Sequence, residues 1–205
     1  MPDYHYTQRW FETARAPKMW QALIPRLPAR KAFLEIGSYE GMSTVWTVEN
    51  MLEDGGSITC IDTWQGDETM TDMQAMESAE GLFDGNMELL SRAHPERSVR
   101  KEKGTSYDTL SRLIGSNGEA SFDFIYVDGS HLAPSVLIDA CMAWPLLKPG
   151  GVMVFDDYLW GNSRDILHRP KLAIDAFLNI FSEQLSPVFI HQQLAVQKVA
   201  GVERS

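Results

Sequence analysis

Short predicted strands alternate with longer helical stretches along almost the whole chain, and this alternation constrains the fold more than any other feature. Helical patterns cover 42–52, 106–114, 133–147 and 164–185. Five strands are expected, at 32–36, 57–61, 98–102, 122–127 and 151–155. Strands that are separated by helices usually pair in parallel, because each helix carries the chain back across a face of the sheet. The pattern therefore predicts an α/β fold with a mostly parallel sheet.

The end of the chain has a different pattern. Segments 187–191 and 194–199 are separated by only two residues, which is typical of an antiparallel hairpin. The expected architecture is thus a doubly wound seven-stranded sheet with an antiparallel C-terminal edge hairpin. At 205 residues, with no internal repeat or Pro/Gly/Ser linker, residues 1–205 are predicted to form a single domain. Residues 1–31 are expected to be an N-terminal helical segment.

The stretch 64–95 is too long for a plain loop and is expected to contain helices of its own. It is interpreted as an insertion that carries methionines at three-residue spacing. Such methionines serve packing, or they form a mobile lid over a site, because flexible thioethers tolerate repacking. The sequence leaves both roles open.

Charge and apolar pattern exclude several classes of function. The formal net charge of -10 at pH 7 argues against a nucleic-acid partner, which requires a basic face. No apolar run approaches the roughly 20 residues of a membrane-spanning helix. The first residues lack the basic and apolar parts of a signal peptide. We expect a cytoplasmic protein without a membrane partner, in which Cys60 and Cys141 are buried free thiols.

A glycine turn follows the first strand. Gly37 lets the chain turn tightly and lets a ligand approach bare backbone, and Gly41 permits close approach of the next helix to the strand. The spacing differs from the Gly-x-Gly-x-x-Gly of dinucleotide folds, so a nicotinamide oxidoreductase is a distant alternative. Glu35 suits a cationic ligand. The cofactor contacts expected here are Glu35, Gly37, Ser38, Gly41 and Ser43; the alternative is a purely structural turn.

Two later strand ends extend this predicted cofactor site. Asp62 follows the second strand, where a carboxylate accepts hydrogen bonds from ribose hydroxyl groups. Thr105 and Ser106 open the helix after the third strand, and its free N–H groups would hold an adenine edge. For Asp62, capping of the following segment is the alternative.

Three motifs resemble those of class I S-adenosylmethionine-dependent methyltransferases, in the usual order. They are Glu35-x-Gly37-x-x-x-Gly41, the Asp62 strand end and Leu147-Lys148-Pro149-Gly150-Gly151. The resemblance covers about 32–199. It implies a Rossmann-like fold, S-adenosylmethionine as cofactor and methyl transfer as the activity.

Two further segments resemble the metal-dependent O-methyltransferases, which include catechol, caffeoyl-CoA and macrolide-sugar enzymes. They are Tyr126-Val127-Asp128-Gly129-Ser130-His131 and Phe155-Asp156-Asp157-Tyr158. The caffeoyl-CoA family has Asn where Asp157 stands, and Asp128-x-x-His131 is closer to the sugar-modifying type. The resemblance implies that His131 acts as the base, as a histidine does in the sugar-modifying family.

The same acids support this chemistry without the resemblance. Asp128 and Asp156 end neighbouring parallel strands, which lie about 4.8 Å apart, so both can reach one ion. Asp157 would join them only if the strand has already ended, because consecutive strand residues face opposite sides. Three carboxylates form a hard oxygen site suited to Mg²⁺ or another divalent cation. Asp128 is also expected to contact the cofactor region. The alternative is that one of Asp156 and Asp157 caps a turn.

The predicted function is O-methylation of a small hydroxylated molecule, such as a sugar or natural-product scaffold, with Asp128 and His131 as catalytic residues. His131 suits the role of base because histidine titrates near neutral pH; it would otherwise cap a helix or ligate the ion. Two alternatives are a metal-independent methyltransferase and a non-catalytic cofactor-binding protein. The sequence leaves open a homo-oligomer in which a neighbouring chain completes the acceptor pocket.

Overall fold

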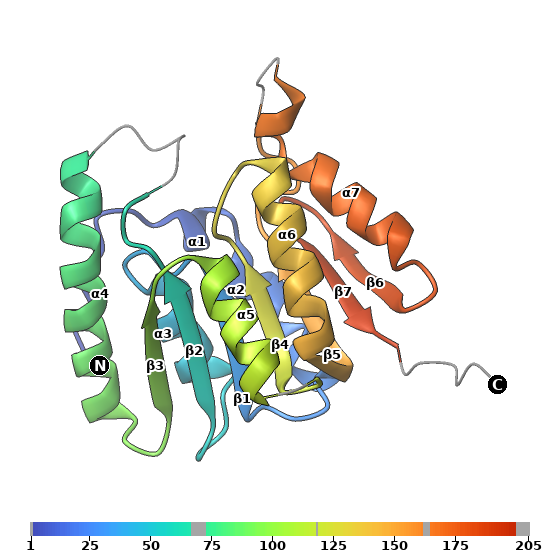
Figure 1. Cartoon of the computed structure of the whole chain (residues 1–205). Helices are drawn as coiled ribbons and strands as arrows, with labels where there is room; N and C mark the ends of the chain where they lie inside the picture. The colour runs from blue at the N-terminus through green and yellow to red at the C-terminus, as the bar shows by residue number, and fades with distance from the viewer. Residues whose placement is uncertain (1, 67–72, 118, 162–164, 200–205) are drawn as a thin grey trace.

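Seven strands form a single sheet in the computed structural model, which describes residues 2–66, 73–117, 119–161 and 165–199 (Figure 1). The sheet order is β3-β2-β1-β4-β5-β7-β6. The strands are β1 (Ala32–Ile36), β2 (Ser57–Asp62), β3 (Ser98–Lys103), β4 (Phe122–Val127), β5 (Leu147–Phe155), β6 (Leu185–Ile190) and β7 (Leu194–Lys198).

The first five strands are parallel, and β7 pairs antiparallel with both β5 and β6. The predicted fold class is confirmed, including the antiparallel edge hairpin. The strand order reverses between β1 and β4, so their carboxyl ends flank the crevice in which such sheets bind ligands.

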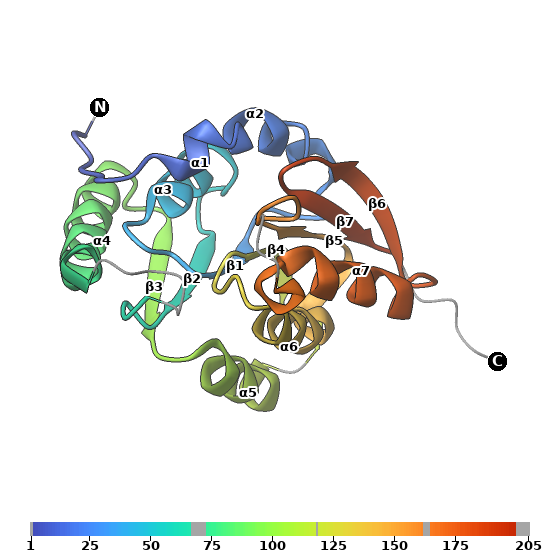
Figure 2. The same ribbon diagram turned by 90° about the horizontal axis from the view of Figure 1, so that it is seen from above.

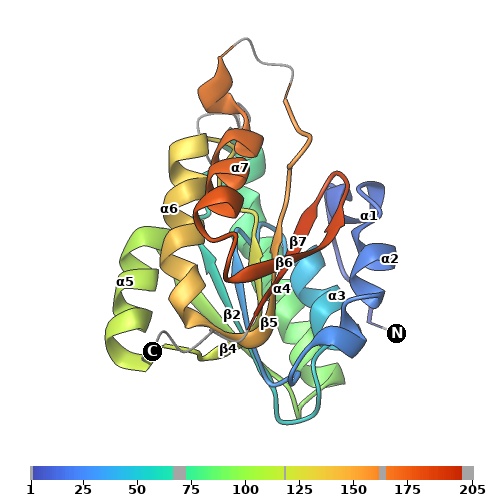
Figure 3. The ribbon, with the colours of Figure 1, turned by 90° about the vertical axis from the view of Figure 1, so that its right-hand side faces the viewer.

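Helices cover both faces of the sheet (Figures 2 and 3). One face carries α1 (Trp10–Thr13), α2 (Ala16–Gln21), η1 (Ile24–Arg26), α3 (Met42–Asn50) and α4 (Met73–Ala93). The other carries α5 (Ser106–Asn117), α6 (Ala133–Ala143), η2 (Trp144–Leu146) and α7 (Pro170–Ile180), with η3 (Ile166–His168) just before α7. None of the described helices is both long and apolar enough to cross a membrane.

Each face has its own apolar core. Trp20, Val48 and Phe83 belong to the cluster under α1–α4, and Leu110 and Phe177 belong to the cluster under α5–α7. All six residues of β4 are buried, as a strand covered on both faces requires. Burial of this apolar surface holds the strand ends of β1 and β4 in a fixed relation.

Two predicted helices differ most from the observed ones, and proline explains the late start of one and the early end of the other. The helix expected over 164–185 is α7, which begins at Pro170 because the residue before a proline avoids the helical region; Arg169 is extended. The helix expected over 133–147 ends at Ala143, and Pro145 stands in the 3₁₀ turn η2 that follows. Residue 164 lies outside the described residues.

The stretch 64–95 contains one long helix, α4, which carries the chain from β2 to β3. Lys101 of β3 pairs with Glu80 and Asp84 of α4 and holds the helix against the sheet edge. Residues 67–72 lie outside the described residues, and a lid function for the stretch stays a prediction.

The two cysteines differ in exposure. Cys60 on β2 is buried, as expected, whereas Cys141 is exposed, so the prediction for Cys141 was wrong. Its neighbour Ala140 is buried on the inward face of α6. One residue further along a helix is rotated by about 100°, which turns Cys141 toward solvent.

Candidate active site

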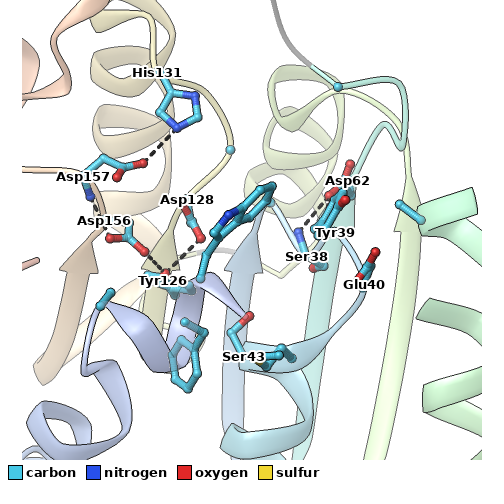
Figure 4. A pocket seen from close by; sticks show the side chains of 18 of the residues that line it. Ser38, Tyr39, Glu40, Ser43, Asp62, Tyr126, Asp128, His131, Asp156 and Asp157 are labelled. Carbon is cyan, nitrogen blue, oxygen red and sulfur yellow. Dashed lines mark hydrogen bonds and ion pairs between the residues drawn. The ribbon is translucent and has the colours of Figure 1, made fainter. Parts of the chain in front are cut away.

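A cavity of about 430 Å³ opens at the carboxyl ends of β1 and β4 (Figure 4). One wall comes from the turn after β1 and the end of β2, and the other from the loops after β4 and β5. The N-terminal segment adds Trp10, Phe11 and Ala14. Of the predicted site residues, those that line the cavity are Gly37, Ser38, Ser43, Asp62, Asp128, His131, Asp156 and Asp157.

Asp62 organises the turn after β1. Its Oδ2 atom accepts hydrogen bonds from the backbone N–H groups of Ser38 and Tyr39, both at 2.8 Å, and its Oδ1 atom accepts one from Trp64 N–H at 2.6 Å. Because each carboxylate oxygen has two lone pairs, Oδ1 keeps capacity for a ligand hydroxyl group. Asp62 therefore shapes the turn and still presents an acceptor to the cavity.

Glu35 lies beneath the turn and does not line the cavity. Its buried carboxylate accepts a hydrogen bond from Ser43 Oγ at 2.6 Å and another from Thr44 Oγ1. Burial raises the pKa of Glu35, and these two hydrogen bonds oppose the shift. Glu35 thus holds Ser43, whose side chain does reach the cavity.

Gly41 also lies behind the cavity wall, as the N-cap residue of α3 with a φ of 81°. A Cβ atom there would lie 2.8 Å from Met87 Cε and 3.0 Å from Phe83 Cδ2. Gly41 therefore permits close approach of α4 to the start of α3, whereas the sequence pattern had indicated packing of a helix against a strand.

The side chain of Ser38 points away from the open part of the cavity, to the buried groups beneath the turn. Ser38 lines the cavity, but its Oγ atom is buried and lies near Glu35 and Cys60, which do not line the cavity. It forms no hydrogen bond of normal geometry with the described residues. The interaction of Ser38 with these two buried groups lowers their pKa values, against the effect of burial.

Thr105 and Ser106 do not line the cavity. Thr105 caps α5: its Oγ1 atom accepts a hydrogen bond from Asp108 N–H at 3.1 Å and donates one to Asp108 Oδ2 at 2.7 Å. The hydroxyl group of Ser106 hydrogen-bonds to the buried Asp139 of α6. Both predicted cofactor contacts have structural partners, and their contact with an adenine stays a prediction.

The opposite wall is acidic. The Tyr126 hydroxyl group lies between two carboxyl groups, 2.9 Å from Asp128 Oδ2 and in hydrogen-bond contact with Asp156 Oδ2 (Figure 4). As a whole residue, Asp128 is exposed and lines the cavity. Its carboxyl group is nevertheless densely surrounded by protein atoms. Burial first, and then the charge of the neighbouring carboxylates, raises the pKa of both Asp128 and Asp156.

Asp157, the second residue after the end of β5 at Phe155, has a left-handed backbone with a φ of 56°. From the sequence, Asp157 could join Asp156 only if the strand ended before it. The strand has ended, its alternation no longer applies, and both Asp156 and Asp157 line the cavity. Asp157 Oδ2 lies 2.9 Å from His131 Nε2. The His131 ring lies against Trp160, with 4.3 Å between ring centroids.

Backbone strain gathers around the cavity. Among the described residues, five that are not glycine have a positive φ, and three of these line the cavity: Tyr39 (46°), Trp64 (51°) and Asp157 (56°). Such conformations cost free energy and are typical of functional sites, where the surrounding structure maintains them. The strain supports the interpretation of this cavity as the active site.

The donor chemistry of the acidic wall fits a hard divalent cation. Asp128, Asp156 and Asp157 supply carboxylate oxygens, which Mg²⁺ prefers, and a cation would relieve the repulsion that raises the pKa values of Asp128 and Asp156. Within the part of the chain that the structure describes, no three acidic, histidine or cysteine side chains stand ready as a metal-binding group. Asp157 is paired with His131 instead.

Sequence reasoning missed several residues of this site. Glu40 is buried and binds the N-terminal segment through Thr7 N–H at 2.7 Å. Trp10 stacks on Tyr39, with 5.1 Å between ring centroids. Tyr126 stood in a quoted motif, but its position between two acids depends on the pairing of β4 with β5. No local pattern signals any of these contacts.

Comparison with known proteins finds a match to a family model described as a methyltransferase domain, over residues 34–158. A probable caffeoyl-CoA O-methyltransferase of Arabidopsis thaliana is 24% identical over 149 residues, which are 72% of this chain and 56% of that protein. The chain spans about half the length of the curated relatives that it matches first.

Solved structures that share the fold include the following two. A Corynebacterium glutamicum protein has 20% identity and a TM-score of 0.61, with 93% of this chain and 83% of that chain covered. The MycE methyltransferase of the mycinamycin biosynthetic pathway, in complex with Mg, SAH and mycinamycin VI, has 17% identity and a TM-score of 0.57, with 98% and 52% covered. At these identities the likeness concerns the fold alone.

Proposed function

We propose, because this chain belongs to the methyltransferase domain family, that it is an S-adenosylmethionine-dependent O-methyltransferase. The acceptor is a small hydroxylated molecule, such as a sugar or a natural-product scaffold. One observation carries this proposal: a single cavity is lined both by the glycine turn with Asp62 and by the group Asp128, His131, Asp156. Residues 1–205 then act as one methyltransferase domain.

The cofactor is assigned to the wall formed by β1 and β2. Gly37 exposes backbone, Ser38 lines the cavity beside it, and Asp62 Oδ1 accepts from the ribose hydroxyl groups. Ser43 contributes from the start of α3, with Glu35 and Gly41 shaping the turn behind it. We keep Thr105 and Ser106 as the adenine contact, since α5 begins at the carboxyl end of β3, beside β2.

The metal is assigned to the acidic wall. Asp128 and Asp156 would hold Mg²⁺ or another divalent cation, with Asp157 as the third carboxylate ligand. When bound, such an ion stabilises the deprotonated form of an acceptor hydroxyl group and so increases its nucleophilicity. The MycE methyltransferase of the mycinamycin pathway, which shares this fold, contains Mg and SAH in its structure, which supports testing this ion first.

His131 is the base in this proposal. Its contact with Asp157 at 2.9 Å and its packing against Trp160 fix the ring at the cavity wall. A histidine in this position would accept the proton of the acceptor hydroxyl group, while the bound cofactor would supply the methyl group by breaking its bond to sulfur and leave as S-adenosylhomocysteine. The two walls hold the reacting groups in one enclosed space, which replaces a bimolecular encounter by a positioned one.

The same His131–Asp157 contact favours a second candidate, a metal-independent methyltransferase. In that enzyme Asp157 would orient the His131 ring and stabilise its charged form, as a carboxylate does for a catalytic histidine in hydrolases. Removal of divalent cations with a chelator separates the two candidates, because it would stop methyl transfer by the metal-dependent enzyme and leave transfer by the metal-independent enzyme unchanged. A third candidate, a non-catalytic cofactor-binding protein, would bind the cofactor and transfer no methyl group to any acceptor.

Calorimetric titration of the protein with S-adenosylmethionine and S-adenosylhomocysteine, with and without Mg²⁺, tests the proposal. We expect both ligands to bind. In a screen of hydroxylated sugars and natural products we expect methyl transfer to at least one compound, and we expect a chelator to abolish this transfer. Absence of cofactor binding would overturn the function as a whole. Transfer that resists the chelator and persists in Asp156→Ala would leave the metal-independent candidate.

A further inference from the structure

A buried chain of hydrogen bonds connects the N-terminal helix α2 with the acidic wall of the cavity. Trp20 Nε1 donates to Gln193 Oε1 at 2.8 Å, and Gln193 Nε2 donates to Asp156 Oδ2 at 3.1 Å and contacts Tyr126 Oη at 3.3 Å. Trp20 and Gln193 are both fully buried, and 173 residues separate them in the sequence. From these contacts we infer that Gln193 is a positioning residue that holds the Asp156 carboxylate for methyl transfer.

The direction of the chain follows from the chemistry of its first member. An indole N–H can only donate a hydrogen bond, so the atom of Gln193 that faces Trp20 must be the amide oxygen. The amide nitrogen then points the other way, toward Asp156 and Tyr126. Trp20 thereby determines that Gln193 presents a donor, rather than an acceptor, to the carboxylate.

Asp156 is held at both oxygens. Its Oδ2 atom accepts from Gln193 and from Tyr126, and its Oδ1 atom accepts from the backbone N–H of Asp157 at 2.7 Å. These donors determine how the carboxylate is turned toward the cavity. Outer partners of this kind orient carboxylates in metal sites, and their loss typically lowers metal affinity or activity 10–100-fold. The inference rests on the proposed function, because Asp156 matters only if the acidic wall takes part in catalysis.

Gln193→Met tests the inference, because methionine preserves the unbranched shape and removes both the donor and the acceptor. Gln197→Met is a matched control on the same hairpin: Gln197 Nε2 donates to two backbone carbonyl groups, of Arg26 at 2.9 Å and Gly150 at 2.8 Å. It does not line the cavity. Gln197→Met loses two donated hydrogen bonds, whereas Gln193→Met loses two donated bonds and the one accepted from the buried Trp20, so we expect Gln193→Met to show the larger decrease in melting temperature.

Three readouts are measured for each variant: kcat and KM, Mg²⁺ affinity by calorimetry with MgCl₂, and the Asp156 orientation in a crystal structure. For Gln193→Met we expect kcat and Mg²⁺ affinity to fall about 10–100-fold together, an unchanged KM for S-adenosylmethionine and a turned Asp156 carboxylate. Gln197→Met should leave the kinetic constants, the Mg²⁺ affinity and the Asp156 orientation unchanged. Trp20→Phe, which removes the indole donor and leaves a smaller buried ring while Gln193 stays in place, should give a smaller loss in the same direction and serves if Gln193→Met fails to fold.

The outcomes separate the inference from the proposed function. An Asp156 carboxylate that keeps its orientation in Gln193→Met, or equal losses in Gln197→Met, would overturn the positioning role. If the wild-type protein transfers no methyl group, the proposed function fails, while the crystal structures still show whether Gln193 orients Asp156.

Discussion

A methyl group on Gly37 would lie 1.9 Å from the carbonyl oxygen of Asp128. The turn that we assign to the cofactor and the loop that carries the acidic wall are thus in direct backbone contact. Asp128 N–H also donates to Ile36 C=O at 2.8 Å, immediately before the turn. The two halves of the cavity are therefore fixed to each other by the pairing of β1 with β4, and a change in one must displace the other.

Gly37→Ala is expected to destabilise the protein and abolish cofactor binding. The new Cβ atom would clash with backbone, and the φ of 85° is itself strained for alanine. We expect the free energy of unfolding to fall by about 3 kcal/mol or more, measured by urea denaturation. Gly81→Ala is the control: Gly81 lies within α4 with nothing within 4 Å of its Cβ position. It should raise stability by up to about 1 kcal/mol.

His131→Gln is expected to lower kcat by about 10²–10⁴-fold, because it removes the proposed base. Cofactor affinity measured by calorimetry should stay within about twofold, as the loss of an interaction made only in the transition state implies. His168→Gln is the matched control, since His168 forms an exposed pair with Asp165 at 3.1 Å and does not line the cavity. Equal kcat values for both variants would contradict the assignment of His131.

Asp139→Asn is expected to make stability less dependent on pH. Burial raises the pKa of Asp139 from 3.8 to about 6, against the effect of the Ser106 hydrogen bond. The native state therefore binds this proton more tightly than the unfolded state, and stability falls as the pH rises from about 4 through about 6. A shift of about two pKa units corresponds to roughly 3 kcal/mol at most.

Denaturation of the two proteins at several pH values measures this effect. The advantage of Asp139→Asn over the wild type should be near zero at pH 4 and should grow to at most roughly 3 kcal/mol at pH 7. A constant difference across this range would show that the Asp139 carboxyl group is not the cause.

Trp10→Ala is expected to weaken binding of the acceptor while leaving the fold intact. Trp10 lines the cavity and stacks on Tyr39, but it is 51% exposed and so contributes little to the core. Loss of an aromatic contact of about 1 kcal/mol should raise the KM for the acceptor several-fold. Tyr107→Ala, which removes an aromatic side chain that is 60% exposed on α5, should leave the KM unchanged.

Local patterns in the sequence were sufficient to predict the strands and the residues that end them. Apolar runs and glycine turns depend on neighbouring residues, so the positions of Gly37, Asp62, Asp128 and Asp156 could be assigned without coordinates. Helix ends were less predictable. Arg169 shows why, because the proline that follows it overrides a longer periodic pattern.

What the sequence by itself determined is the α/β class, the order of the motifs and the set of acids at strand ends. Tertiary structure alone decided which side chains meet: Asp157 with His131, Tyr126 with two carboxylates, and Trp20 with Gln193. The physical reason is that these contacts form between segments far apart in the chain, through sheet pairing and burial of the two apolar cores. Such contacts leave no periodic signal in the residues that make them.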